Sequence, residues 1–416
     1  PQVSALAQAR TFPFLSRWPR RICPPRAPPM SSRRELGFNC TDSRSYAAWD
    51  ENTTFAKHLY ALAAGQIASL KSLDDASKPA VLLDLGTCDG RSTAPCFREC
   101  ARHIRERDAG AHPPRPQRPV VAIFEDHRHN EWSPLLTRDL KHELGEGVFP
   151  LVSNTSFYEE VTAPGSVDLA FSNCAMHFLA SSEPPGTFQK ALRHVTADAS
   201  LAEDAAAIAA FRATAAADWQ RLLLCRAAEL KPGGRLVVSS FAVDERTGFH
   251  WGHGGTGASI YHVLAECVQG LVRDGLLTSA EQRRATSPAY YRSLAEFTAP
   301  LDDPNSAVSR AGLVLASAEV RHFACPLRAE LVAQRAAAAP VDAAAYAQTF
   351  VEMLRCVTSW EVVRAFGSGS GDEARPADER QRLVDRVYAD FAARVEARPD
   401  DFSFDFVLCH MVIEKS

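Results

Sequence analysis

The chain has 416 residues, of which 46% are hydrophobic and 23% are charged, and its formal net charge is −4. A chain of this composition can bury a large core in one or two domains, and its charge gives no general electrostatic reason to bind nucleic acid or an anionic membrane. No apolar run in the sequence is long enough to cross a bilayer, so we expect no transmembrane helix.

The first residues differ in composition from the rest. Residues 1–34 are rich in arginine and proline and contain no acidic residue, and we interpret residues 1–38 as a disordered leader or targeting segment. A leader that precedes a start at Met30 is favoured over an organelle transit segment. The eleven cysteines form no Cys-x-x-Cys pair, which is typical of free thiols in a reducing compartment. We therefore expect a cytoplasmic protein, or an organellar one if residues 1–34 are a transit segment.

From about residue 80 onward, apolar runs alternate with amphipathic stretches. The first apolar run is followed by a helix that Ser92 or Thr93 can cap, and a later helix ends at a proline- and glycine-containing turn over 231–234. The apolar runs predict strands over 81–85, 120–124, 166–171, 235–241, 315–321 and 402–413. Strands that alternate with helices predict an α/β fold with a Rossmann-like, mostly parallel sheet.

Two helical stretches are too long to be simple crossovers between strands. They lie at 258–300 and 327–400, and we interpret them as two parts of a helical cap over the carboxyl edge of the sheet. The ligand-binding α/β domain then spans 39–257, the chain returns to the sheet over 301–326, and the last strand lies within 401–416.

The first predicted strand ends in an Asp-x-Gly-x-x-x-Gly motif. Asp84 precedes Gly86 and Gly90, and glycines allow a sharp turn and a close approach of a ligand to the backbone. A dinucleotide fingerprint needs glycine where Cys88 stands, because its helix must bind a pyrophosphate. A turn without that phosphate site suits S-adenosylmethionine, whose cationic groups Asp84 would attract. The motif therefore predicts an S-adenosylmethionine site at the carboxyl end of the first strand.

Further candidate residues follow the next strands and so belong to the same edge of the sheet. Asp126 ends the second strand and can accept hydrogen bonds from both ribose hydroxyls. Ser156 can bond an adenine edge, and Phe157 can stack on the adenine face. His177 follows the strand over 166–171 as a candidate donor to a substrate carboxylate, with Phe178 as a pocket wall. Each also has an ordinary interpretation as a loop acid or a core side chain.

In order and spacing, six segments resemble the SABATH family of S-adenosylmethionine-dependent carboxyl methyltransferases, the salicylate, jasmonate and caffeine type. The segments are Asp84–Gly90, Asp126–Leu135, Ser156–Tyr158, Ser172–Leu179, Asp218–Arg226 and Ser287–Tyr291. The resemblance implies a class I methyltransferase sheet, S-adenosylmethionine as cofactor, S-adenosylhomocysteine as product and a small organic acid as substrate. Homodimers are common in this family, so the resemblance allows a homodimer here.

The resemblance also implies which residues bind each ligand. The cofactor-binding residues would be Asp84, Gly86, Gly90, Asp126, Ser156, Phe157, Ser172 and Cys174. Two donors that the family uses for the substrate carboxylate are replaced, a glutamine by Ala56 and a tryptophan by Phe178. We hypothesise that His177 replaces them together with Tyr290 or Tyr291 of the cap. We expect no metal, because residues 283–286 lack the acidic motif of the metal-binding plant members.

A carboxylate acceptor is ionised at neutral pH and needs no general base, so we predict no residue in general acid–base catalysis. The replaced glutamine and tryptophan leave two alternatives open. One is methylation of a nitrogen or a phenol oxygen of a small metabolite, and the other is a non-catalytic cofactor-binding protein with the same fold. A nicotinamide-dependent dehydrogenase is disfavoured because the glycine pattern is broken at Cys88.

Overall fold

The computed structural model describes residues 55–181, 184–188, 205–252, 259–367 and 375–416. The predicted leader or targeting segment over 1–38, with Met30, lies outside the described residues. Among the residues that are described, no helix combines the length and the apolar character that crossing a membrane requires.

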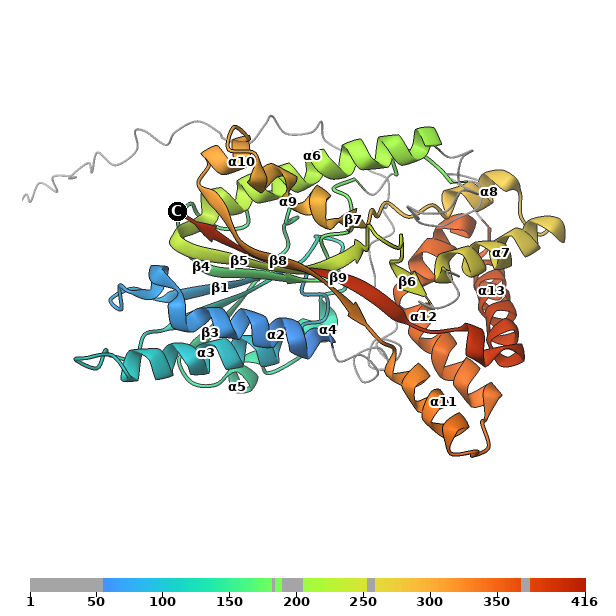
Figure 1. The fold of residues 1–416 in the computed structure, drawn as a ribbon, viewed down its shortest axis with the longest axis horizontal. Helices are drawn as coiled ribbons and strands as arrows, with labels where there is room; N and C mark the ends of the chain where they lie inside the picture. Colours follow the sequence, from blue (N-terminus) through green and yellow to red (C-terminus); the bar gives the residue numbers. More distant parts are fainter. Residues whose placement is uncertain (1–54, 182–183, 189–204, 253–258, 368–374) are drawn as a thin grey trace, which may run out of the picture. The chain divides into compact units, whose positions relative to one another are not determined.

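A central sheet organises the described part of the chain (Figure 1). Its nine strands run in the order β3-β2-β1-β4-β5-β9-β6, with β7 beside β5 and β8 beside β9. The pairs from β3 to β5 are parallel, and β9 is antiparallel to β5, β6 and β8. The strands are β1 (Ala80–Leu85), β2 (Val120–Glu125), β3 (Val148–Ser153), β4 (Val167–Asn173), β5 (Leu230–Val243), β6 (Trp251–Gly252), β7 (Arg292–Ser293), β8 (Leu313–Phe323) and β9 (Asp405–Lys415).

Helices cover both faces of the sheet (Figure 1). Apolar side chains of α2, α3 and α5 pack on one face of β1 and β2, and those of α6, α9 and α10 pack on the other face of the sheet. These helices and the short segments between them are α2 (Phe55–Gln66), η1 (Ile67–Ser69), η2 (Lys71–Leu73), α3 (Thr93–Ala109), α4 (Ser133–Leu136), α5 (Leu140–Leu144), α6 (Ala205–Glu229), α9 (Leu294–Asp302) and α10 (Ala307–Arg310). This two-sided burial explains why the parallel strands read as continuous apolar runs.

The predicted strands are confirmed, with corrections at the start of β5 and at the start of the last strand, β9, which begins at Asp405 and not at 402. The turn predicted over 231–234 is part of the strand, because β5 begins at Leu230 directly after α6. The pairing of β4 with β5 shifts register between Val167 and Leu169, and this irregularity accommodates the extra residues. Strand β3 was not predicted, since it lies at the edge of the sheet and its apolar residues Phe149 and Leu151 are exposed.

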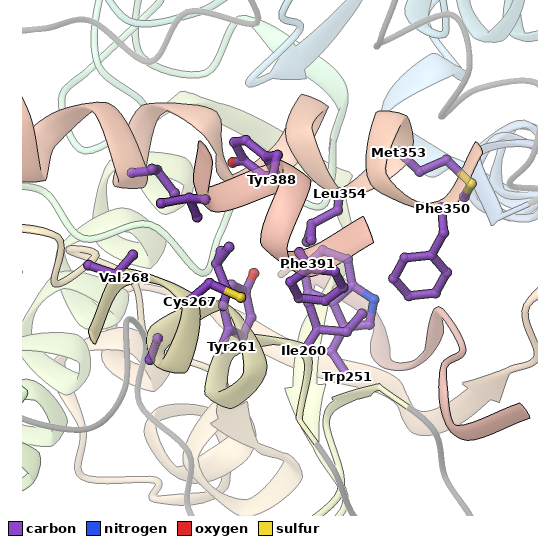
Figure 2. Close-up of a cluster of buried hydrophobic side chains, with 14 of the residues drawn as sticks. Trp251, Ile260, Tyr261, Cys267, Val268, Phe350, Met353, Leu354, Tyr388 and Phe391 are labelled. Atoms are coloured by element: carbon purple, nitrogen blue, oxygen red, sulfur yellow. The ribbon is translucent and has the colours of Figure 1, made fainter. Parts of the chain in front are cut away.

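A second apolar core joins the remaining helices to the carboxyl end of β5 and the amino end of β9. Figure 2 shows residues of α7 and β6 facing residues of α12 and α13 within this core. The helices are α7 (Ile260–Arg273), α8 (Ser279–Arg284), α11 (Pro326–Ala336), α12 (Ala343–Gly367), α13 (Ala377–Ala397) and η4 (Pro399–Asp401). The domain division stays a prediction. Phe297 and Leu301 of α9 pack in the core on the sheet. This packing favours a boundary before α9 for the first part of the cap, which was predicted to reach residue 300.

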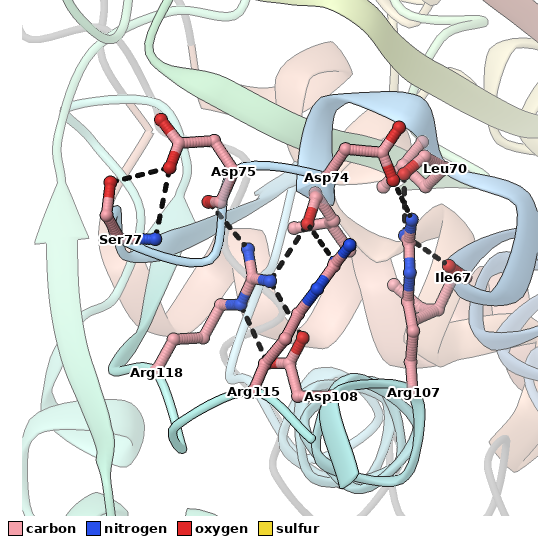
Figure 3. Close-up of polar contacts among 10 residues, drawn as sticks. Ile67, Leu70, Asp74, Asp75, Ser77, Arg107, Asp108, Arg115 and Arg118 are labelled. Carbon is pink, nitrogen blue, oxygen red and sulfur yellow. Dashed lines mark hydrogen bonds and ion pairs between the residues drawn. The ribbon is translucent and has the colours of Figure 1, made fainter. Parts of the chain in front are cut away.

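A buried ion pair anchors the edge of the sheet where β2 begins (Figure 3). The Arg118 guanidinium, 4% exposed, donates to both carboxylate oxygens of Asp108 at 2.7 and 2.8 Å. It also donates to the carbonyl oxygens of Leu73 at 2.8 Å and Asp75 at 3.1 Å. The four bonds tie the end of α3 and the η2 loop to β2, at the end of the strand remote from the candidate site.

Candidate active site

The turn after β1 is closed by two glycines, as the motif predicts. Gly86 and Gly90 have φ angles of 84° and 70°, in the left-handed region that favours glycine. A Cβ on Gly86 would lie 2.5 Å from the Cβ of Ala175, and one on Gly90 would lie 2.3 Å from a methyl carbon of Leu135. The Gly86 turn therefore touches the loop that follows β4, with no room for a side chain between them.

Cys88 lies at the centre of this turn in an unusual backbone conformation. Its φ is 54°, and Asp126 and Asn130 fix its peptide groups: the Cys88 N–H donates to Asp126 Oδ2 at 2.6 Å, and Asn130 Nδ2 donates to the Cys88 carbonyl at 2.8 Å. Cys174, just after β4, also has a φ of 54°. Such strained residues persist where their surroundings fix them and often occur at ligand sites.

Three carboxyl groups lie at the ends of β1 and β2, and burial raises the pKa of each. The pKa of Asp84 is raised to about 7 and that of Asp126 to about 6, and the pKa of Glu125 is well above its ordinary value. Backbone N–H groups of Cys88 and His127 oppose the rise at Asp126. A cationic ligand at this edge would favour the ionised forms.

The predicted helix cap at Ser92 is wrong, and the side chain of Thr93 bonds to the Asp84 carboxyl instead of capping the helix. Ser92 has helical φ and ψ, and its side chain makes no capping bond to α3. The Thr93 hydroxyl donates to Asp84 Oδ2 at 2.5 Å and accepts the Thr87 hydroxyl at 3.0 Å. These bonds hold the Asp84 carboxyl, which is 3% exposed, beneath the turn.

Of the other predicted cofactor residues, Ser156 and Phe157 lie on the loop after β3, and Ser172 lies in β4. Phe157 lies beside Gly86, because a Cβ on Gly86 would be 3.9 Å from its ring. The Ser156 hydroxyl accepts the Tyr158 N–H at 3.3 Å. Ser172 is fully buried, and its hydroxyl donates to the Leu85 carbonyl at 2.8 Å, which ties β4 to β1.

Two side chains of helix α6 bond to the loops that follow β3 and β4. Asp218 accepts the Ala180 N–H at 2.8 Å. Arg226 is fully buried and donates to the carbonyls of Phe157 at 3.0 Å and Glu159 at 2.8 Å. It also forms an ion pair with Glu229 at 2.8 Å. The sequence pattern that includes Asp218 and Arg226 had signalled the family, but their contacts depend on the fold and were not predicted.

His177 lies in an aromatic cluster at the carboxyl ends of β4 and β5. The centroid of its ring is 4.0 Å from Phe178, 5.2 Å from Phe241 and 5.4 Å from Tyr291. The segment before β7 pairs with this loop, since the Tyr290 N–H donates to the His177 carbonyl at 2.8 Å. The pairing brings Tyr291 of the cap to His177.

Tyr290 faces another cluster. Its ring packs with Leu179, Phe188 and Phe211, and its hydroxyl donates to Glu296 at 2.7 Å. Of the two tyrosines predicted beside His177, only Tyr291 therefore joins it. The rings of Phe241, Tyr261 and His250 also belong to the aromatic cluster around Tyr291, although no motif in the sequence indicates these three residues.

Among the described residues, no three His, Cys, Asp or Glu side chains are grouped so that they could hold a metal ion. The sequence model of the family described as SAM dependent carboxyl methyltransferase matches residues 41–381. The chain belongs to this family. The protein is thus an S-adenosylmethionine-dependent methyltransferase.

Relatives and a solved structure agree with this assignment. The methyltransferase is 27% identical to "O-methyltransferase acrG" of Aspergillus aculeatus over 77% of this chain and 80% of that protein. It is 28% identical to "Probable jasmonic acid carboxyl methyltransferase 2" of Theobroma cacao over 34% of this chain and 37% of that protein. Its fold is that of the structure titled "Loganic acid methyltransferase with SAH", with a TM-score of 0.66 and 15% identity over 87% of this chain and 93% of the other.

Proposed function

We propose that this methyltransferase esterifies the carboxylate of a small organic acid with an apolar body, held beside His177 and Tyr291. The observation that carries the proposal is their apposition at the carboxyl end of β4, one loop away from the Gly86 turn. His177 and Tyr291 supply polar groups, and Phe178 and Phe241 supply apolar walls. Such a combination suits an acid whose body is apolar.

The groups at the Gly86 turn fit S-adenosylmethionine. The residues that would hold it are Asp84, Gly86, Gly90, Asp126, Ser156, Phe157, Ser172 and Cys174. Each oxygen of Asp126 accepts one backbone N–H, which leaves acceptor capacity for ribose hydroxyls. Asn173 Oδ1 is buried without a hydrogen-bond partner among the described residues. An ammonium donor from the ligand would satisfy this acceptor.

The chemistry needs alignment more than proton transfer. When bound, S-adenosylmethionine supplies a methyl group that passes to the carboxylate oxygen while sulfur keeps the electron pair of the broken bond, so no proton is released. His177 and Tyr291 would orient the acceptor, and the surrounding rings would exclude water. Orientation of this kind contributes up to about 7–11 kcal/mol in favourable cases.

The test is turnover of an acceptor panel by the purified protein with labelled S-adenosylmethionine. The panel contains aromatic acids (benzoate, cinnamate, indole-3-acetate), an aliphatic acid (octanoate), phenols and xanthines. We expect methyl esters of one or more acids, identified by mass spectrometry. Methylation of phenols or xanthines alone would refute the proposal in favour of a different acceptor. Heat on titration with S-adenosylhomocysteine, without turnover of any acceptor, would make the protein a binding homologue.

A matched pair of variants tests the substrate residues. Tyr291→Phe removes the hydroxyl from the ring that lies beside His177, and we expect it to raise KM for the acid. Tyr290→Phe removes a hydroxyl one residue away that bonds Glu296 instead, so KM should stay within about twofold. Equal effects of the two substitutions on KM would contradict the assignment of Tyr291.

A further inference from the structure

The two edges of the sheet differ in how they are protected from pairing with a further strand. Apart from the two-residue strands β6 and β7, the edge strands are β3 and β8, and each pairs with one neighbour among the described strands. Pro150 lies within β3 and has no N–H, so it interrupts the donors along that edge. β8, which runs beside β9 (Figure 1), has 11 residues and no proline. Its edge therefore offers backbone donors and acceptors without such an interruption.

The side chains of β8 are accessible on both faces of the strand. Leu315 and Val320 pack against the core on the α6 side of the sheet, but both are only partly buried. Glu319 and Arg321 flank Val320 and point to the other face, because side chains alternate along a strand. Their side chains are 52% and 53% exposed. The strand thus presents apolar groups on one face and charges on the other.

These charges make the strand complementary to itself. Glu319 Oε1 and Arg321 Nη2 form an ion pair within β8, 2.6 Å apart. If two copies of β8 pair antiparallel about Val320, residues at equal distances before and after this centre face each other. Glu319 of each copy then faces Arg321 of the other, and four charges of alternating sign form a ring. Cross-strand pairs of opposite charge stabilise a sheet, and like charges directly opposite destabilise it.

The same register fits the limits of the strand. It pairs residues 317–323 of one copy with residues 323–317 of the other. The pairing of β8 with β9 shifts register between Leu315 and Ser317, directly before this segment, and β8 ends at Phe323. At the centre, Val320 of one copy faces Val320 of the other on the apolar face. The regular part of β8 is therefore used in full.

We propose that β8 is the interface of a symmetric homodimer, in which the sheets of two copies join by antiparallel pairing of residues 317–323 about Val320. The same surface serves both copies, as in other twofold interfaces. This inference does not depend on which acceptor the enzyme methylates. Because one pair of strands buries less area than an obligate interface, we expect a weak dimer with a Kd in roughly the micromolar range.

The experiment measures the sedimentation of the full chain at roughly 1 to 500 μM, a range that brackets this Kd. Arg321→Glu gives each copy two acidic side chains at the ring, and Glu319→Arg gives each copy two basic ones. Either variant alone opposes like charges across the interface, so its Kd should weaken roughly 10- to 100-fold. An equal mixture of the two variants restores both pairs of opposite charge. We expect it to form a heterodimer with a Kd near that of the wild-type dimer, detected through a fluorophore at the amino terminus of one variant.

A matched control and a salt titration accompany the variants. Arg382→Glu reverses one charge of the exposed pair with Asp378 on α13, and it should leave the Kd of the dimer unchanged. Added salt screens exposed charges. Raising the salt concentration should therefore weaken the wild-type dimer, which needs no variant to fold, and strengthen the self-association of each charge-reversal variant. Melting temperatures report on folding, and those of the three variants should match the wild type because the changed side chains are exposed.

Four results would overturn the inference. The first is a wild-type protein that sediments as a monomer over the whole range, as it would if another segment of the chain covered β8. The second is a dimer whose Kd neither charge reversal changes, since it would use another surface. The third is a failure of the two folded variants to associate when mixed. The fourth is a wild-type dimer that salt does not weaken.

Discussion

The contact of Arg226 with the loop that carries Phe157 gives a quantitative prediction. Arg226 is fully buried and bonds two loop carbonyls, and it is the ionic partner of Glu229, which is 1% exposed. In Arg226→Met, the methionine fills much of the space but leaves Glu229 without its cation. The Val161 and Thr162 N–H groups remain as donors to Glu229.

Removing one partner of a buried ion pair costs about 3–5 kcal/mol. Burial already raises the pKa of Glu229, and Arg226 opposes that rise, so the variant should take up a proton at this carboxyl and limit the loss to the lower part of this range. Arg226→Met with Glu229→Gln removes both charges and keeps an acceptor for the two N–H groups. It should recover at least about half of the lost stability, since no unpaired charge remains.

Cofactor affinity should fall along with stability. If the freed loop keeps its binding conformation in about a tenth of the molecules, the apparent affinity for S-adenosylhomocysteine weakens about tenfold. Urea unfolding measures the first effect and calorimetric titration the second. Arg382→Met removes a surface pair with Asp378 and should cost less than about 1 kcal/mol. A similarly small cost for Arg226→Met, or an unchanged affinity in a destabilised variant, would refute this reasoning.

Three further results are expected. Gly86→Ala combines a positive φ with a Cβ contact of 2.5 Å, so it should abolish most S-adenosylhomocysteine binding. The control Gly275→Ala, at a φ of 72° with open space around the Cβ, should cost only about 1–2 kcal/mol of stability. Equal S-adenosylhomocysteine binding by the two variants would contradict the steric argument. Burial raises the pKa of Asp84 from 3.8 to about 7, so between these pH values the folded state retains a proton that the unfolded chain loses. The free energy of unfolding should therefore fall by up to about 4 kcal/mol as the pH rises through this range. Asp84→Asn should flatten this part of a plot of the urea midpoint against pH. Arg118→Met should lower stability by about 3–5 kcal/mol by leaving Asp108 unpaired, yet kcat per folded molecule should not change.

The arrangement of the sheet was predictable because its strands are buried on both faces. Continuous apolar runs indicated β1, β2 and β4. The edge strand β3 was not predicted, because its Phe149 and Leu151 are exposed and its sequence shows no continuous apolar run. The start of β5 was misjudged for another reason. The proline and glycines over 231–234 signal a turn locally, but pairing with β4 keeps them in an irregular strand.

The candidate site was predictable where local sequence sets the backbone. Gly86 and Gly90 indicate a turn in which any other residue would place a Cβ too close to its neighbours. The choice between Tyr290 and Tyr291 depends instead on the pairing of their segment with the loop after β4, which points adjacent side chains in different directions. His250 gave no signal at all, because its contacts with Tyr291 arise only when β6 pairs with β9.

Strand β9 has a consequence for how the protein is made. It pairs with β5, β6 and β8, and its side chains enter the cores on both faces of the sheet and in the cap. During synthesis β9 leaves the ribosome after all these partners, so none of these three cores can close until then. The growing chain must therefore keep an open, apolar sheet edge protected from aggregation, and chaperone dependence should be concentrated in that interval.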